Sequence, residues 1–172
     1  MLLSAYGLSM DLPSGWEGAI FVYGAAATDG AIARPILHAG NFALPVDYSG
    51  FGTGIVQQIA PGDVFAAVCE YDPNSAAAPL FASPRRPSNL SLADFNTATL
   101  AIAFPGQMGY QQFFNSNGRA FSFYAVLGIQ SDMSGQVSAL NSVLATLSIG
   151  PGNSSYYVTS AASAEAAAVE TS

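Results

Sequence analysis

Apolar and polar residues alternate along the first part of the chain, which is typical of strands with one buried face. Over residues 5–12 the apolar side chains occupy every second position, and a turn with proline and glycine follows at residues 13–15. Trp16 then opens a second predicted strand at residues 17–23, and residues 35–43 predict a third. The first quarter of the chain is therefore expected to be rich in strands.

A buried strand and a hairpin are the clearest predictions further along. Residues 63–71 are apolar almost throughout, as expected for a strand covered on both faces. Residues 110–116 and 119–127 are strand-like runs joined by Asn117-Gly118, which tolerates positive φ and favours a tight hairpin turn. Alternation sends the aromatic residues of this hairpin to both faces. The second face therefore needs a cover, from the same chain or from another subunit.

In other stretches the alternation of apolar and polar residues is less regular. Residues 24–34 are small, polar and contain glycine, which predicts a loop, and the proline-rich residues 72–89 predict a long connection. Residues 55–59 fit either a short helix or a strand, and residues 97–104 are a further candidate strand.

One amphipathic helix is predicted over about residues 134–147. Ser131, Asp132 or Ser134 could supply the N-cap oxygen, and a Gly-Pro-Gly sequence at residues 150–152 ends the element. Its apolar residues recur at spacings of three and four and form one stripe: Val137, Leu140, Leu144 and Leu147.

These elements predict an α+β fold, in which an antiparallel β-sheet carries the C-terminal amphipathic helix on one face. A chain of 172 residues suits one domain, which we place at residues 1–150. Residues 151–172, here called the arm, form a Ser/Ala-rich C-terminal extension without a large apolar face. Alone, the arm is expected to be disordered or weakly helical.

Charged residues are scarce in this chain, which bears on how its surface interacts with other molecules. Only 9% of residues are charged and none is lysine, whereas soluble domains average about 25%. Lysine often guards exposed strands against association, so this surface resists association weakly. Compositional drift is one interpretation. The other is that neighbouring subunits cover much of the surface in an ordered assembly.

Composition also argues against several classes of partner and site. The net charge of −7 with four arginines argues against nucleic-acid binding. One cysteine and one histidine cannot form a disulfide framework or a tetrahedral zinc site, and no cofactor is predicted. No apolar run reaches the roughly 18 residues of a transmembrane helix. With no export signal visible, a cytoplasmic location is the default, and a cell-surface or extracellular assembly stays open.

Few residues suggest catalysis. His38 lies between Leu37 and Ala39 of a predicted strand, where a histidine with one satisfied hydrogen bond is the simpler interpretation than a general base. Cys69 lies in an apolar run without cationic neighbours, as an inert buried thiol does. Glu70 and Asp72 are expected to be exposed acids at a strand end, with a weak calcium site as the alternative.

The opening Leu-Pro-Ser-Gly-Trp sequence of residues 12–16, the antiparallel sheet and the closing helix that ends Val-Leu-Ala-Thr-Leu at residues 143–147 resemble the Mog1/PsbP-like superfamily. The resemblance covers about residues 1–149. Known members are mostly binding or extrinsic subunits, including a small-GTPase partner and an extrinsic photosystem subunit. The resemblance therefore implies a docking scaffold, and it carries over no functional residue.

The leading functional hypothesis is a non-catalytic structural or interaction subunit that self-associates into a ring or filament through its charge-poor surface and its arm. Arg85 and Arg86 could dock a carboxylate of a partner or of a neighbouring arm, or form a solvated loop pair. Tyr156, Tyr157 and Val158 could pair with or pack on a neighbour. The alternatives are a monomeric intracellular adaptor for a protein partner and, less favoured, a small hydrolase using His38 or Cys69.

Overall fold

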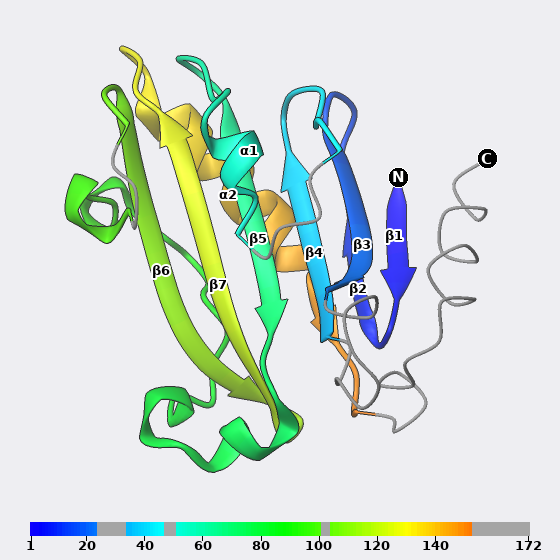
Figure 1. Cartoon of the computed structure of the whole chain (residues 1–172). Helices are drawn as coiled ribbons and strands as arrows, with labels where there is room; N and C mark the ends of the chain where they lie inside the picture. Colours follow the sequence, from blue (N-terminus) through cyan, green and yellow to red (C-terminus); the bar gives the residue numbers. More distant parts are fainter. Residues whose placement is uncertain (24–33, 47–50, 101–103, 153–172) are drawn as a thin grey trace.

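The computed structural model describes residues 1–23, 34–46, 51–100 and 104–152, which form an α+β structure (Figure 1). Two antiparallel sheets and one main helix near the C-terminus make up this part of the chain. The predicted fold class is confirmed, with two sheets in place of the single one expected. The predicted loop at residues 24–34, except Arg34, and most of the arm lie outside the described residues.

A small sheet has the strand order β1-β2-β8 and is formed by β1 (Leu2–Ala5), β2 (Leu8–Asp11) and β8 (Ser148–Ile149). The strand predicted over residues 5–12 is confirmed at residues 8–11 as β2 but was wrong at its beginning, because the chain reverses at Tyr6 and Gly7 with φ of 52° and 71°. Alternation continues through this turn, so the apolar pattern alone does not reveal it.

The large sheet has the order β3-β4-β5-β7-β6, with every neighbouring pair antiparallel. The prediction for residues 63–71 is confirmed, because β5 and β7 lie inside the sheet and all their side chains are buried. Its strands are β3 (Glu17–Tyr23), β4 (Arg34–Gly40), β5 (Val64–Glu70), β6 (Gln107–Ser116) and β7 (Arg119–Gly128).

The β6–β7 hairpin turns at the predicted dipeptide. Asn117 and Gly118 have φ of 52° and 75°, the left-handed conformations that this tight turn requires. Ser116 pairs directly with Arg119, and the register continues without interruption to Gln107 and Gly128.

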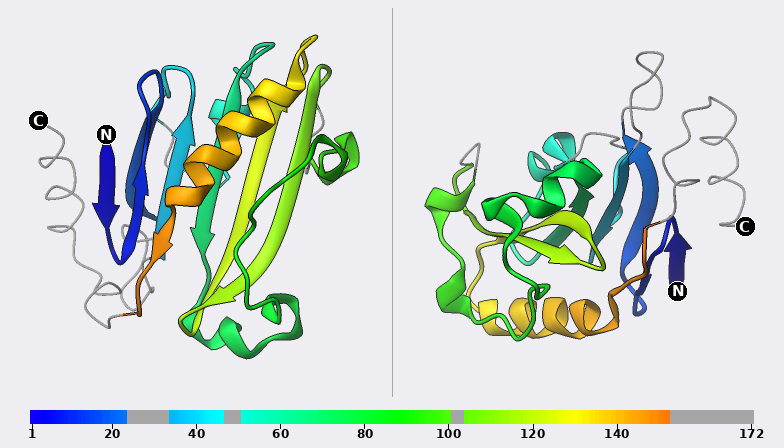
Figure 2. Two further views of the ribbon diagram at one scale, coloured as in Figure 1. Left: turned by 180° about the vertical axis from the view of Figure 1, so that it is seen from behind. Right: turned by 90° about the horizontal axis from the view of Figure 1, so that it is seen from below.

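Helix α2 (Met133–Thr146) lies across one face of the large sheet, as predicted (Figure 2). Among the three candidate N-caps the structure selects Asp132, whose Oδ1 accepts a hydrogen bond of 3.2 Å from the Gly135 amide. The apolar stripe of α2 packs with Phe121 and Phe123 of β7 in the main core.

Segments of the same chain cover the opposite face of the large sheet. There α1 (Thr53–Val56) lies in front of β5 (Figure 1), and the Phe81 ring packs on Phe113 of β6 with centroids 5.7 Å apart. No second subunit is needed to cover Phe113. The other short elements are the 3₁₀ turns η1 (Pro73–Ala77), η2 (Pro79–Phe81), η3 (Leu92–Asp94) and η4 (Thr97–Thr99).

The strand predicted over residues 97–104 was wrong at its beginning, where η4 forms. Asn96 accepts hydrogen bonds of 2.9 Å from both the amide and the hydroxyl of Thr99, and these local bonds favour a turn over an extended strand. Residues 101–103 lie outside the described residues. In the described ranges, no helix has the length and apolar character needed to cross a membrane.

Candidate functional site

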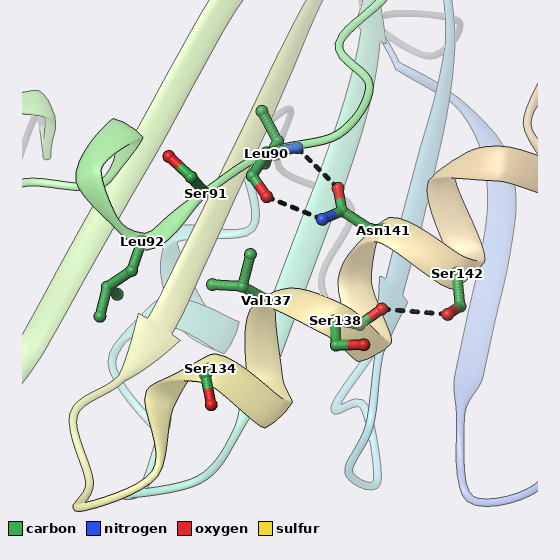
Figure 3. A pocket seen from close by; sticks show the side chains of 8 residues that line it. All are labelled: Leu90, Ser91, Leu92, Ser134, Val137, Ser138, Asn141 and Ser142. Atoms are coloured by element: carbon green, nitrogen blue, oxygen red, sulfur yellow. Dashed lines mark hydrogen bonds between the residues drawn. The ribbon is translucent and has the colours of Figure 1, made fainter.

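An open groove of about 500 Å³ runs between α2 and the segment at residues 90–92, which leads into η3 (Figure 3). We call it the serine groove, because four of its lining side chains are serines and none is charged. Its lining residues are Leu90, Ser91, Leu92, Ser134, Val137, Ser138, Asn141 and Ser142.

The two walls of the serine groove are tied together by one side chain of α2. The Asn141 carboxamide accepts a hydrogen bond from the Leu90 amide and donates one to the Leu90 carbonyl, both 2.8 Å long. This pair of hydrogen bonds resembles the two that join paired residues of neighbouring β-strands, and it holds residues 90–92 beside the helix (Figure 3). The Asn141 side chain therefore holds the two walls of the groove together.

The outer side of α2 continues this neutral surface. Ser134, Ser138 and Ser142 are exposed at intervals of one helical turn, and the other exposed positions of the helix are Gly135, Ala145 and Thr146. A surface helix normally presents charged residues to water. This one presents only small uncharged side chains.

The structure gives the two candidate arginines different surroundings. Arg86 turns inward, and its Nη1 donates hydrogen bonds to the carbonyls of Leu144, at 2.6 Å, and Leu147. It thereby caps the C-terminus of α2, where the helix dipole favours a cation. Arg85 is exposed, and its backbone carbonyl accepts a 2.9 Å hydrogen bond from Gln112. Docking of a carboxylate by either arginine stays a prediction.

Tyr156, Tyr157 and Val158 lie outside the described residues. Ile149 and Gly150, which precede the arm and are here called its root, are held by hydrogen bonds. The Gly150 amide donates to the Gly7 carbonyl at 2.7 Å, and the Asn117 carboxamide donates to the Ile149 carbonyl at 2.6 Å. Arg119 Nη1 adds a 3.1 Å hydrogen bond to the Gly150 carbonyl. The arm therefore starts from a point tied to both the β1–β2 and β6–β7 turns.

A buried ion pair supports this root, and sequence reasoning missed it. Arg119 forms a bidentate contact with Glu70, with Nε to Oε1 at 2.8 Å and Nη2 to Oε2 at 2.7 Å. Arg119 Nη2 also donates to the Tyr6 carbonyl at 3.0 Å. Glu70 is 4% exposed, so it is not the exposed strand-end acid that was expected. The sequence did contain a signal for this ion pair, because Glu70 stands at the end of one apolar strand and Arg119 at the beginning of another.

His38 lies deep in the sheet. It is 2% exposed, and its ring stands edge-on to those of Phe21 and Phe65 at centroid distances of 4.9 and 5.2 Å. It lines a pocket of about 170 Å³ with Glu17, whose Oε2 accepts a 3.0 Å hydrogen bond from the Leu44 amide. The carboxylate at this pocket is therefore engaged with backbone.

Cys69 is buried on the same face of the sheet as His38. Burial raises the pKa of its thiol to about 12, and a hydrogen bond with Ser122 opposes this shift only in part. The thiol is therefore protonated at neutral pH, and a protonated thiol is a poor nucleophile.

A second pocket, here called the aromatic pocket, lies beside α1 on the sheet face opposite α2 and encloses about 140 Å³. Its floor is the cross-strand pair Gln111 of β6 and Tyr124 of β7. Burial raises the pKa of Tyr124. The lining residues are Phe51, Thr53, Val56, Thr99, Phe104, Gln111 and Tyr124.

Among the described residues, no three His, Cys, Asp or Glu side chains gather as a metal ion would require. Comparison with known proteins adds no family: no family model, no curated protein and no solved structure matches the chain.

Proposed function

We propose that this protein is a non-catalytic interaction subunit that self-associates through its charge-poor surface and its arm. The observation that carries the proposal is the serine groove with the adjoining outer side of α2. The side chains that line the groove and those exposed along α2 are all uncharged, and the carboxylates of Asp94 and Asp132 lie at the edges, where they accept hydrogen bonds from Ser91 and Ser134.

The physical reason is the cost of removing charges from water. Charged residues are depleted at the centre of protein interfaces, because an ion that loses its hydration is costly unless it is well paired. Burying the serine groove and the outer side of α2 in an interface would dehydrate none of the side chains that line them as ions. Their small side chains also let a second backbone approach α2 closely, and Leu92 at the rim offers a 42% exposed apolar side chain.

The buried positions of the candidate catalytic groups support a binding role. His38 is enclosed by two phenylalanine rings, and Cys69 holds its proton. A relationship to the Mog1/PsbP-like superfamily, whose members mostly serve as docking subunits, remains part of this proposal. The arm then acts as the extension that one copy offers to the next.

The test places a charge in the groove of the full-length chain. Ser138→Arg should weaken self-association at least tenfold, because the guanidinium has no acidic partner among the groove residues. Ala77→Arg is the matched control, since Ala77 is exposed at the end of η1 and lies outside the groove. Light scattering after size exclusion, over a range of concentrations, measures both variants and the wild type.

The outcomes separate the hypotheses. Loss of assembly in Ser138→Arg but not in Ala77→Arg supports the neutral surface as an interface. A wild-type chain that is monomeric at every concentration contradicts self-association and favours the monomeric adaptor. Equal assembly of all three proteins shows that the groove is not the interface.

A further inference from the structure

The aromatic pocket has the volume and the lining to hold one aromatic ring. It is partly open to solvent and has a volume of about 140 Å³, close to the roughly 150 Å³ of a closed apolar cavity that holds benzene. The rings of Phe51 and Tyr124 meet edge to face with centroids 5.9 Å apart, so a third ring can continue the same arrangement. Phe51 is 39% exposed, which leaves the pocket accessible from outside.

Two polar groups in this pocket lack partners. Tyr124 is 7% exposed, yet its hydroxyl makes no hydrogen bond within the described residues, and neither does the carboxamide of Gln111 opposite it. Neither group is among the side-chain atoms that are fully closed to water, so both remain accessible to a ligand that enters the pocket. A ligand that fills the pocket should therefore carry both a ring and a polar group, as a phenol does.

The arm offers this chemistry, because Tyr156 and Tyr157 are its aromatic residues. Its root, however, lies on the other side of the sheet. Gly150 is held by Arg119, and Arg119 and Tyr124 are five residues apart on β7, so their side chains point to opposite faces.

The geometry disfavours an arm that returns to its own pocket. Tyr156 and Tyr157 follow Gly150 by six and seven residues, a reach of about 20–25 Å when fully extended. Tyr124 lies about 16 Å along β7 from Arg119, and the arm would also have to pass around the sheet. A second copy can present its pocket without this detour.

We propose that the aromatic pocket receives a tyrosine of the Tyr156–Tyr157 pair from the arm of a second copy. This inference rests on the proposed self-association and names its acceptor site. The donor and acceptor surfaces differ, so the contact is head to tail and produces a ring or a filament according to whether the rotation closes.

The test uses complementary full-length variants. Gln111→Arg puts a charge on the floor of the pocket, and Tyr156→Ala/Tyr157→Ala removes the rings from the arm. Each should weaken self-association at least tenfold. An equimolar mixture should form a one-to-one dimer that grows no further, because only one intact arm and one intact pocket remain. Sedimentation velocity measures the masses.

Two controls accompany these variants. Gln57→Arg makes the same substitution at an exposed position next to α1 and should assemble like the wild type. Tyr156→Phe/Tyr157→Phe keeps the rings and should retain most of the association. Thermal unfolding verifies that each variant is folded, and Thr99→Arg at the same pocket replaces Gln111→Arg if that variant does not fold.

The failures can be told apart. If the folded pocket variants assemble like Gln57→Arg, the pocket is not the acceptor, whereas self-association itself stands. A mixture that stays monomeric also overturns the arm-and-pocket contact. If the wild type is monomeric throughout, the proposed function fails, and this inference fails with it.

Discussion

Arg119 connects elements that are far apart in the sequence. Its guanidinium contacts the Glu70 carboxylate and the carbonyls of Tyr6 and Gly150, and its Cζ lies 5.1 Å from the centre of the Phe121 ring. One buried side chain therefore links the large sheet, the β1–β2 turn and the root of the arm.

Arg119→Met should destabilise the domain by about 3–5 kcal/mol, because it leaves the buried Glu70 carboxylate without its partner. Urea unfolding of both proteins measures the difference. The double variant Arg119→Met/Glu70→Leu should regain part of the loss, since it removes the uncompensated charge. A cost below about 1 kcal/mol in the single variant would contradict this assignment.

Cys69 should be unreactive in the folded protein. Because its thiol pKa is raised to about 12, thiolate is scarce at pH 8, and burial also blocks access. A colorimetric thiol reagent should therefore detect no fast-reacting thiol in the native chain and one thiol per chain in denaturant. Native labelling at the rate of a free cysteine would disprove this prediction.

At the scale of elements, helix α2 depends on contacts at both ends. Asp132 caps its N-terminus and Arg86 caps its C-terminus, while Asn141 ties its middle to Leu90. The periodicity of the sequence predicts the helix itself. Arg86 and Asn141 reach segments about 50 residues or more away, and no local pattern predicts such partners.

The cap at Asp132 should make α2 sensitive to acid. Hydrogen bonds from Ser134 and from the Gly135 amide hold the pKa of Asp132 below its usual value of 3.8. A lowered folded-state pKa contributes stability above the unfolded value, and this stability is lost as pH falls through the folded value. The melting temperature should therefore decrease below about pH 4.

Asp132→Asn isolates this contribution. Asparagine can still cap a helix but does not titrate in this range, so the variant should lose less stability than the wild type between neutral pH and pH 3. Asp132→Ala should be less stable than either at neutral pH. Thermal melts followed by circular dichroism give all three curves, and parallel pH dependence in wild type and Asp132→Asn would refute the prediction.

The whole molecule has a different surface on each side. One side presents α2 and the other presents α1 (Figures 1 and 2). The serine groove lies on the first side and the aromatic pocket on the second. The arm root lies with the first side, next to β8 and the hairpin turn. This polarity is the arrangement that head-to-tail association requires.

Removal of residues 153–172 should leave a folded domain that no longer assembles. The interactions that hold Ile149 and Gly150 all remain in the truncated chain, so its melting temperature should stay within a few degrees of the wild type. Light scattering measures the mass. Unchanged assembly of the truncated chain would show that the arm has no part in self-association.

The sequence by itself determined the local elements of this protein. The β6–β7 hairpin follows from Asn117-Gly118 between two alternating runs, and α2 follows from its apolar stripe, because both depend on nearby residues. The α+β class follows from these elements. The charge-poor surface is likewise a matter of composition.

Only the tertiary structure decided which distant residues meet. The Glu70–Arg119 pair and the inward turn of Arg86 bring together groups separated by tens of residues in the sequence. The serine groove and the aromatic pocket likewise combine residues from separate segments. Packing against a common core sets these contacts, and local propensity carries no information about them.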